Sequence, residues 1–171
     1  MKKNERLKCF PFNGLVTRED VVIFGIPTFD EIEPLLLTAA AFNQIDITET
    51  IKIPEVKPDV EQINQMQLQV CLKDAWFTTS NQKIFIKGVI WQKVTYTSCD
   101  KDQPVHTVEK DFSFSHFVDI PSGAIIPPGA DPFDLIVLVP EDAFIQMENG
   151  RTLFKNVLVN ALLFVDVMPP S

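Results

Sequence analysis

The stretch over residues 44–66 constrains the fold most strongly, because it joins a strict apolar–polar alternation to a corner made by two prolines. One side of the alternation carries isoleucine at positions 45, 47, 51 and 53, and Glu49 falls on that same side. Such a period of two predicts a half-buried β-strand. Pro54 has no N–H to donate and ends the ladder, while Pro58 keeps the residue before it extended. The segment therefore predicts a strand, a rigid corner and a second strand.

Two further segments alternate in the same way. The apolar faces are Met66, Leu68, Val70, Leu72 and Trp76 in the first, and Ile84, Ile86, Ile90, Val94 and Tyr96 in the second. Gly88 stands in line with the second face, which suggests a bulge or the close approach of another backbone. One or two strands are expected over residues 105–120, followed by a Pro/Gly-rich loop over 121–132.

The C-terminal third predicts a β-hairpin. Residues 135–139 and 143–147 read as a strand interrupted at Pro140. The Asn149–Gly150 pair is typical of a type I′ turn, in which both central residues need a positive φ. Residues 153–167 then form the return strand, which should be central and should bury the side chains of Val159, Ala161, Leu163 and Val165.

These patterns predict an all-β fold, a β-sandwich of about 7–9 mostly antiparallel strands. Residues 1–43 are expected to form an N-terminal arm and one short helix, and residues 44–171 the sandwich domain. The helix is predicted between Phe29 and Phe42, with Pro34 tolerated near its first turn. Val21–Ile26 is a candidate strand.

Composition excludes several classes of partner. The chain has 171 residues and a formal net charge of −8, so an acidic surface should repel nucleic acid and anionic membranes. The basic N-terminus is not followed by a continuous apolar run, since Pro11 and Gly14 interrupt it. We therefore expect synthesis in the cytoplasm without a signal peptide.

The residues that could carry chemistry are few. The two histidines are His106 and His116, and Ser113 should point away from His116 because the two lie an odd number of residues apart on one strand. No catalytic, cofactor-binding or metal-binding motif is present, so we expect a chain that is not an enzyme. Trp76 and Trp91 are expected to pack in the core rather than to stack on sugars. Asp59 should cap a short turn over residues 60–63, within a solvated acidic run with Glu55 and Glu61.

The three cysteines, Cys9, Cys71 and Cys99, form no C-x-x-C pair, and an odd count leaves one thiol without an internal partner. Cys9 lies in the arm, so we expect it to bridge to Cys71 or Cys99 of a neighbouring chain. The competing interpretation is three reduced thiols that act as small hydrophobic side chains.

Residues 1–20 lack periodicity and are expected to dock on a neighbouring subunit. They could add a strand to a sheet edge or lay apolar side chains into a groove. The alternative is an arm packed against its own domain. The candidate anchoring residues are Leu7, Phe10, Phe12 and Leu15.

Two motifs resemble the SPOCS domain of spore coat and spore morphogenesis proteins from endospore-forming bacteria, over residues 44–167. The first motif holds Pro54, Pro58, Asp59 and Glu61, and the second includes Gln103, Pro104 and His106. The resemblance implies no catalytic residue. It implies a role in building the protein layers or appendages of an endospore, with synthesis in the mother cell and deposition on the spore surface.

Three functions remain open at this point. The leading one is a structural, self-assembling subunit of the coat, the exosporium or a spore fibre, which forms a homo-oligomer or polymer and contacts other coat proteins. The second is a morphogenesis adaptor that binds another coat protein without polymerising. The third is a carbohydrate-binding or enzymatic β-sandwich that uses Trp76, Trp91 or the loop over residues 121–132.

Overall fold

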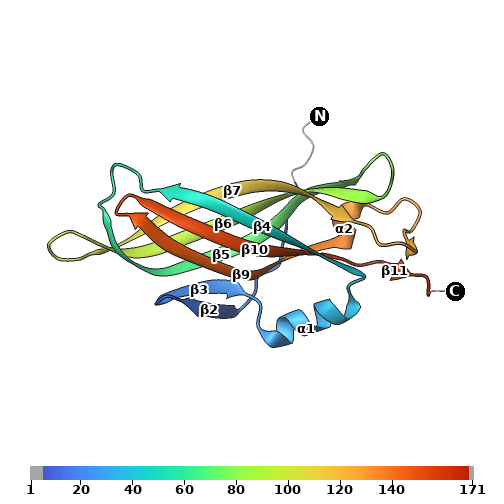
Figure 1. The fold of residues 1–171 in the computed structure, drawn as a ribbon, viewed down its shortest axis with the longest axis horizontal. Coiled ribbons are helices and arrows are strands. Elements are labelled where there is room, and N and C mark those ends of the chain that lie inside the picture. Colours follow the sequence, from blue (N-terminus) through green and yellow to red (C-terminus); the bar gives the residue numbers. More distant parts are fainter. Residues whose placement is uncertain (1–5, 170–171) are drawn as a thin grey trace.

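Two β-sheets pack face to face in the computed structural model, which describes residues 6–169 (Figure 1). The larger sheet runs in the order β2-β3-β5-β6-β7, with β1 paired to β5. Its strands are β1 (Lys8–Cys9), β2 (Gly14–Arg18), β3 (Val21–Ile26), β5 (Val60–Phe77), β6 (Lys83–Ser98) and β7 (Val105–Asp119). The smaller sheet runs β4-β10-β9 and consists of β4 (Ala41–Lys52), β9 (Ile136–Asn149) and β10 (Thr152–Leu163).

The remaining elements are short. They are two helices, α1 (Phe29–Thr38) and α2 (Pro132–Leu135), and a separate pair of strands, β8 (Ala124–Ile125) and β11 (Asp166–Val167). The β8 strand lies inside the stretch expected to be loop. Among the described strands only β3 and β5 pair in parallel, so the mostly antiparallel β-sandwich is confirmed. Neither described helix has the length and apolar character needed to cross a bilayer.

The core lies between the two sheets and follows the predicted alternation. The four isoleucines of the first strand are buried, and so is the whole predicted face of β6 from Ile84 to Tyr96. Val159, Ala161 and Leu163 are fully buried on central β10, as expected. Val165 lies just beyond β10 and is only half-buried.

Trp76 departs from the predicted face because the pairing register shifts. A bulge lies between Leu72 and Asp74 on β5, opposite β6. An extra residue in one strand reverses which side chains point inward beyond it. Ala75 therefore enters the core, while Trp76 lies on the outer surface and is 42% exposed.

The predicted close approach at Gly88 is present. The ring of Phe114 on β7 lies directly over this glycine, and a Cβ added there would come within 2.3 Å of Phe114 Cζ. Gly88 also pairs with Leu72 at the bulge in β5. A bulge in the paired strand and the close approach of another group therefore both occur at Gly88.

The C-terminal hairpin forms, with two differences from the prediction. Strand β9 continues through Pro140, where a register shift against β10 absorbs the missing N–H on this edge strand. The turn lies at Gly150 and Arg151, and neither of these residues nor Asn149 has a positive φ, so the type I′ assignment is wrong. A two-residue turn with positive φ at both positions occurs instead at Glu19 and Asp20, between β2 and β3.

The N-terminal part of the chain is built into the same sandwich. The expected strand and helix form as β3 and α1, and Thr28 and Glu31 make a capping box at the start of the helix. Val21, Ile23 and Ile26 belong to the same core as the rest of the chain. The expected boundary at residue 43 therefore does not separate two packing units, because β3 hydrogen-bonds to β5.

Candidate functional site

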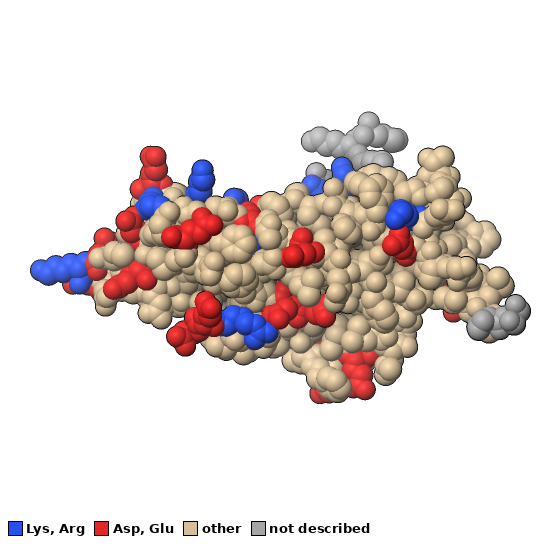
Figure 2. Space-filling model, in the orientation of Figure 1, with Lys and Arg blue, Asp and Glu red and all other residues tan. Residues whose placement is uncertain are grey.

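The two predicted motifs, 42 residues apart at their nearest ends, meet at one end of the sandwich. The connections β4–β5, β6–β7 and β9–β10 all lie at the left in Figure 1. We call this region, residues 53–61, 98–106 and 149–151, the motif end. Figure 2 shows acidic and basic side chains crowded at this end of the visible face.

Arg151 holds the proline corner in place. Its guanidinium donates to the backbone carbonyls of Ile53 (3.1 Å), Pro54 (2.8 Å) and Lys57 (2.6 Å), and to Asp59 Oδ1 (3.1 Å). A guanidinium offers five donors in a fixed plane, which suits this set of acceptors. Sequence reasoning missed Arg151, although a basic residue in a hairpin turn opposite a carbonyl-rich proline corner was a usable signal.

Asp59 does not cap a turn over residues 60–63, because β5 already begins at Val60. The backbone of Asp59 and Val60 instead joins the other two connections. The Cys99 N–H donates to Asp59 O (3.0 Å), and the Val60 N–H donates to Gly150 O (2.8 Å). The first motif thus joins the neighbouring connections through its backbone, while the Asp59 carboxylate pairs with Arg151.

The second motif contacts the first directly. Gln103 Nε2 donates to Glu61 Oε2 at 2.5 Å. The Pro104 carbonyl accepts from the Ser98 N–H at 3.0 Å and closes the β6–β7 turn. The His106 ring stacks on Tyr96, with centroids 5.7 Å apart, and the Tyr96 hydroxyl donates to Pro58 O at 3.0 Å. All seven predicted motif residues therefore lie at the motif end, and each takes part in one of these contacts.

The motif end shapes the reactivity of Cys99, the one free cysteine of the described residues. Desolvation raises the pKa of this exposed thiol, and the negative charges of Glu61, Asp59 and Asp100 raise it further. A higher pKa lowers the thiolate fraction at neutral pH, and the thiolate is the nucleophile. Within residues 6–169 no group of three His, Cys, Asp or Glu side chains is placed to hold a metal ion.

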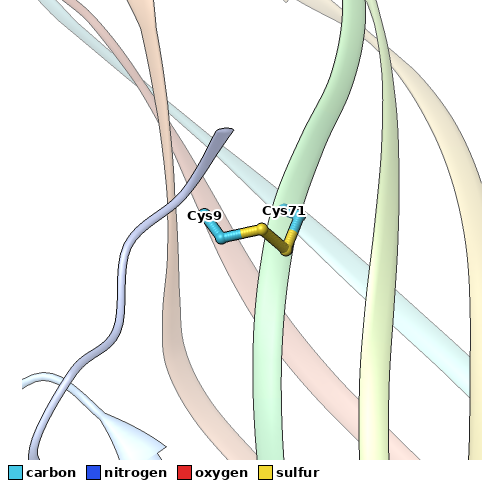
Figure 3. The surroundings of a disulfide bond; sticks show 2 residues. All are labelled: Cys9 and Cys71. Carbon is cyan, nitrogen blue, oxygen red and sulfur yellow. A yellow bond between two sulfur atoms is a disulfide. The ribbon is translucent and has the colours of Figure 1, made fainter. Parts of the chain in front are cut away.

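A disulfide ties the N-terminal arm to its own sheet (Figure 3). Strand β1 pairs antiparallel with β5 so that Cys9 lies directly opposite Cys71, and the two sulfurs are bonded. The expected interchain bridge from Cys9 is therefore wrong, as is the alternative of three reduced thiols. Sequence spacing could not show this pairing, because the two cysteines are 62 residues apart and only the strand register brings them together.

Charged residues of the arm strengthen this attachment. Arg6 pairs with Asp74 at 2.8 Å and with Asp131, and its guanidinium lies 4.2 Å from the centre of the Phe133 ring. Lys8 Nζ donates to the Phe133 carbonyl oxygen. The described part of the arm therefore packs on its own domain, which was the alternative expectation. Residues 1–5 lie outside the described residues.

The apolar side chains of the arm remain largely uncovered. Leu7 is 62% exposed and Leu15 is 54% exposed, while Phe10 is exposed and Phe12 half-buried. Phe10 and Phe12 line a shallow groove together with Phe24 and Trp91 on the outer face of the larger sheet. Trp91 is therefore not a core residue either.

A row of aromatic rings crosses the same outer face. Trp76, Phe85 and Phe117 are paired in register on β5, β6 and β7. Their ring centres are 4.6 Å apart for the first pair and 5.0 Å for the second. Trp76 thus packs across strands as predicted, but outside the sandwich rather than in its core.

Residues 59–137 match the family model described as SipL, SPOCS domain. The matched segment spans β5 to α2 and includes Asp59, Glu61, Gln103, Pro104 and His106, whereas Pro54 and Pro58 precede it. Neither the curated proteins nor the solved structures gave a match. The resemblance seen in the two motifs is confirmed.

Proposed function

Because residues 59–137 match the SPOCS domain family model, we propose that this protein is a non-catalytic, self-assembling structural subunit of an endospore surface layer or appendage. The family indicates a sporulation-related role. Coat, exosporium and fibre are the candidate locations. The proposal adds that copies of this chain contact one another through the N-terminal arm.

The exposed apolar side chains of the arm carry this proposal. Leu7, Phe10 and Leu15 are presented to solvent on a segment that a disulfide and Arg6 hold in place. Fixing a binding segment in advance lowers the ordering cost of association. Full burial of such side chains contributes roughly 1.5–3 kcal/mol each before other costs.

Strand edges offer a second source of contacts. Strands β2 and β7 end the larger sheet, and each has a single hydrogen-bonded neighbour among the described strands. An end strand leaves one row of backbone donors and acceptors for a strand from another copy. Repetition of one heterologous contact gives a ring if the rotation closes and a filament if it does not.

The disulfide supports the proposed location. Such bonds persist in oxidising surroundings and are rare in the cytosol of most bacteria. We propose synthesis in the mother-cell cytoplasm, deposition on the spore surface, and oxidation of Cys9 and Cys71 there. Immunogold labelling of sporulating cells and of released spores tests this, and label confined to the mother-cell cytosol would contradict it.

Size-exclusion chromatography and negative-stain microscopy of the purified full chain test self-assembly. Rings, sheets or filaments are expected. A protein that elutes as a monomer over the whole accessible concentration range would contradict the proposal.

A morphogenesis adaptor is the second candidate, and the motif end favours it. Val56 and Val105 are both strongly exposed there, beside the charged side chains of the β4–β5 and β6–β7 connections. An exposed apolar centre with a polar rim is typical of a protein-binding surface. A monomer that co-purifies with another coat protein, and loses it on Val56→Asp substitution, would support the adaptor over the polymer.

A further inference from the structure

Three polar side chains meet inside the apolar core, between the two sheets. Glu49 comes from β4, Gln92 from β6 and Lys155 from β10. Gln92 and Lys155 are fully buried and Glu49 is 8% exposed. Burial of an ammonium group is costly unless it is paired, so this placement requires an explanation.

The contacts among the three side chains are reciprocal. Lys155 Nζ donates to Glu49 Oε2 at 2.8 Å and also contacts Gln92 Oε1. Gln92 Nε2 donates to the same Glu49 oxygen at 3.0 Å. One carboxylate oxygen therefore touches both an amine nitrogen and an amide nitrogen, and the amine lies against the carboxamide.

These contacts bring together the three groups that amide exchange uses. The amine is the nucleophile, the carboxamide carbon is the electrophile, and a carboxylate that reaches both nitrogens can move protons between them. Fixing reactants at contact distance replaces the high concentration that the same reaction needs in solution. The apolar surroundings keep water away from the amide.

We propose that Lys155 and Gln92 become joined by an intramolecular isopeptide bond, with Glu49 as the catalytic residue. The proposal is independent of the proposed function, because it concerns a single turnover within one chain.

The step balances without an oxidant or cofactor. Glu49 takes a proton from the Lys155 ammonium group, and the neutral Nζ attacks Cδ of Gln92. Glu49 returns that proton to Nε2 and takes a second proton from Nζ. The Nζ–Cδ bond remains, the Cδ–Nε2 bond breaks, and nitrogen leaves as ammonia. That ammonia takes the second proton from Glu49, so an ammonium ion departs and the carboxylate is restored.

The electrostatics around the three groups agree with this chemistry. Burial lowers the pKa of Lys155, although Glu49 partly opposes that effect. A lower pKa raises the fraction of Lys155 that is present as the neutral, nucleophilic amine. Burial raises the pKa of Glu49, but hydrogen bonds from Lys155 and Gln92 outweigh burial and hold it below its usual value. Lys110 Nζ lies 3.1 Å from Glu49 Oε1 on the outer side, and this charge helps to keep Glu49 a proton acceptor.

The bond would cross-link the two layers of the sandwich. Gln92 lies in the larger sheet and Lys155 in the smaller sheet, and 63 residues separate them. A covalent link of this kind limits the unfolded chain in the same way as a disulfide, yet reducing agents do not cleave it.

Intact mass spectrometry of the purified full chain tests the proposal. The expected mass is that of the sequence with its disulfide, less one ammonia, about 17 Da. Trypsin should then give a branched peptide in which residues 88–93 are linked to the peptide that begins at residue 152, uncut after Lys155. A full-length mass with a free Lys155 peptide, or an ammonia loss located elsewhere, would overturn it.

Three variants separate the roles. Glu49→Gln and Lys155→Arg should both keep the full mass, the first because the proton carrier is missing and the second because the amine is missing. Lys93→Arg, on the outer face of β6, is the matched control and should still lose ammonia. Should a core variant fail to fold, the wild-type peptide map alone decides the question. Ammonia loss retained in Glu49→Gln would overturn the role of Glu49.

Discussion

Arg151 lies 3.1 Å from Asp59, and the same guanidinium binds three carbonyl oxygens of the corner between β4 and β5. A hairpin turn from the C-terminal part of the chain thus fixes the turn that carries the first motif. Without the guanidinium, three carbonyl oxygens at a partly buried position would need hydrogen bonds from water instead.

Arg151→Gln should therefore lower the free energy of unfolding by about 1–3 kcal/mol, since several hydrogen bonds to one charged group are lost. Arg18→Gln is the matched control, because Arg18 pairs with Asp142 at the surface (2.8 Å) and otherwise donates only to the carbonyl of its neighbour Thr17 among the described contacts. That variant should cost about 0–1 kcal/mol. Urea denaturation measures both. Equal costs would show that Arg151 is an ordinary surface residue.

Gly88→Ala should destabilise the sandwich by roughly 1–3 kcal/mol, because the new methyl group meets the Phe114 ring. In a Phe114→Ala background the same change should cost much less, since the opposing ring is gone. A double-mutant cycle from thermal or chemical unfolding isolates this coupling. Additive effects would indicate that the ring does not determine the requirement for glycine.

The disulfide between Cys9 and Cys71 determines how many cysteines can be alkylated. Alkylation of the denatured, unreduced protein should modify only Cys99, and alkylation after reduction should modify all three cysteines. A peptide map of the monomer band should contain Cys9 linked to Cys71. Cys71→Ser should lower the free energy of unfolding by roughly 2–4 kcal/mol, as expected for loss of a bridge that closes a long loop. A Cys9 peptide linked only between chains would contradict the structure.

Cys99 should react slowly at neutral pH. Its pKa is raised, mainly by desolvation and then by the nearby carboxylates, so alkylation should reach its midpoint at a higher pH than in a small thiol. Glu61→Gln removes one negative charge and should shift the midpoint to lower pH. The pH dependence of the iodoacetamide rate measures this. A midpoint at or below that of glutathione would contradict the assigned surroundings.

The strands that were predictable are those in which one face is buried. Ile45, Ile47 and Ile51 lie on one face that only Glu49 interrupts, so both the strand and its buried face followed from the sequence. At Trp76 the strand was right and the face was wrong, because a bulge at Leu72–Asp74 leaves no reliable trace in residue types. The rule that alternate residues of a strand share a face fails beyond any extra residue.

The N-terminal region was less predictable because its strands are short and mostly exposed. Only tertiary pairing with β5 makes β1 a strand, and the Glu19–Asp20 turn lacks the usual glycine or asparagine. The cluster of three buried polar side chains was only partly predictable from the sequence. Glu49 stood out on an isoleucine face, whereas Gln92 and Lys155 each looked like single polar residues until the strand registers placed all three together.

Sedimentation velocity tests self-association through the arm. The wild-type chain is compared with a variant that carries Leu7→Ser, Phe10→Ser and Leu15→Ser, and with Leu37→Ser as a control for an exposed apolar residue on α1. We expect large assemblies for the wild type and the control, and a folded monomer for the arm variant. Assemblies of unchanged size in the arm variant would contradict it.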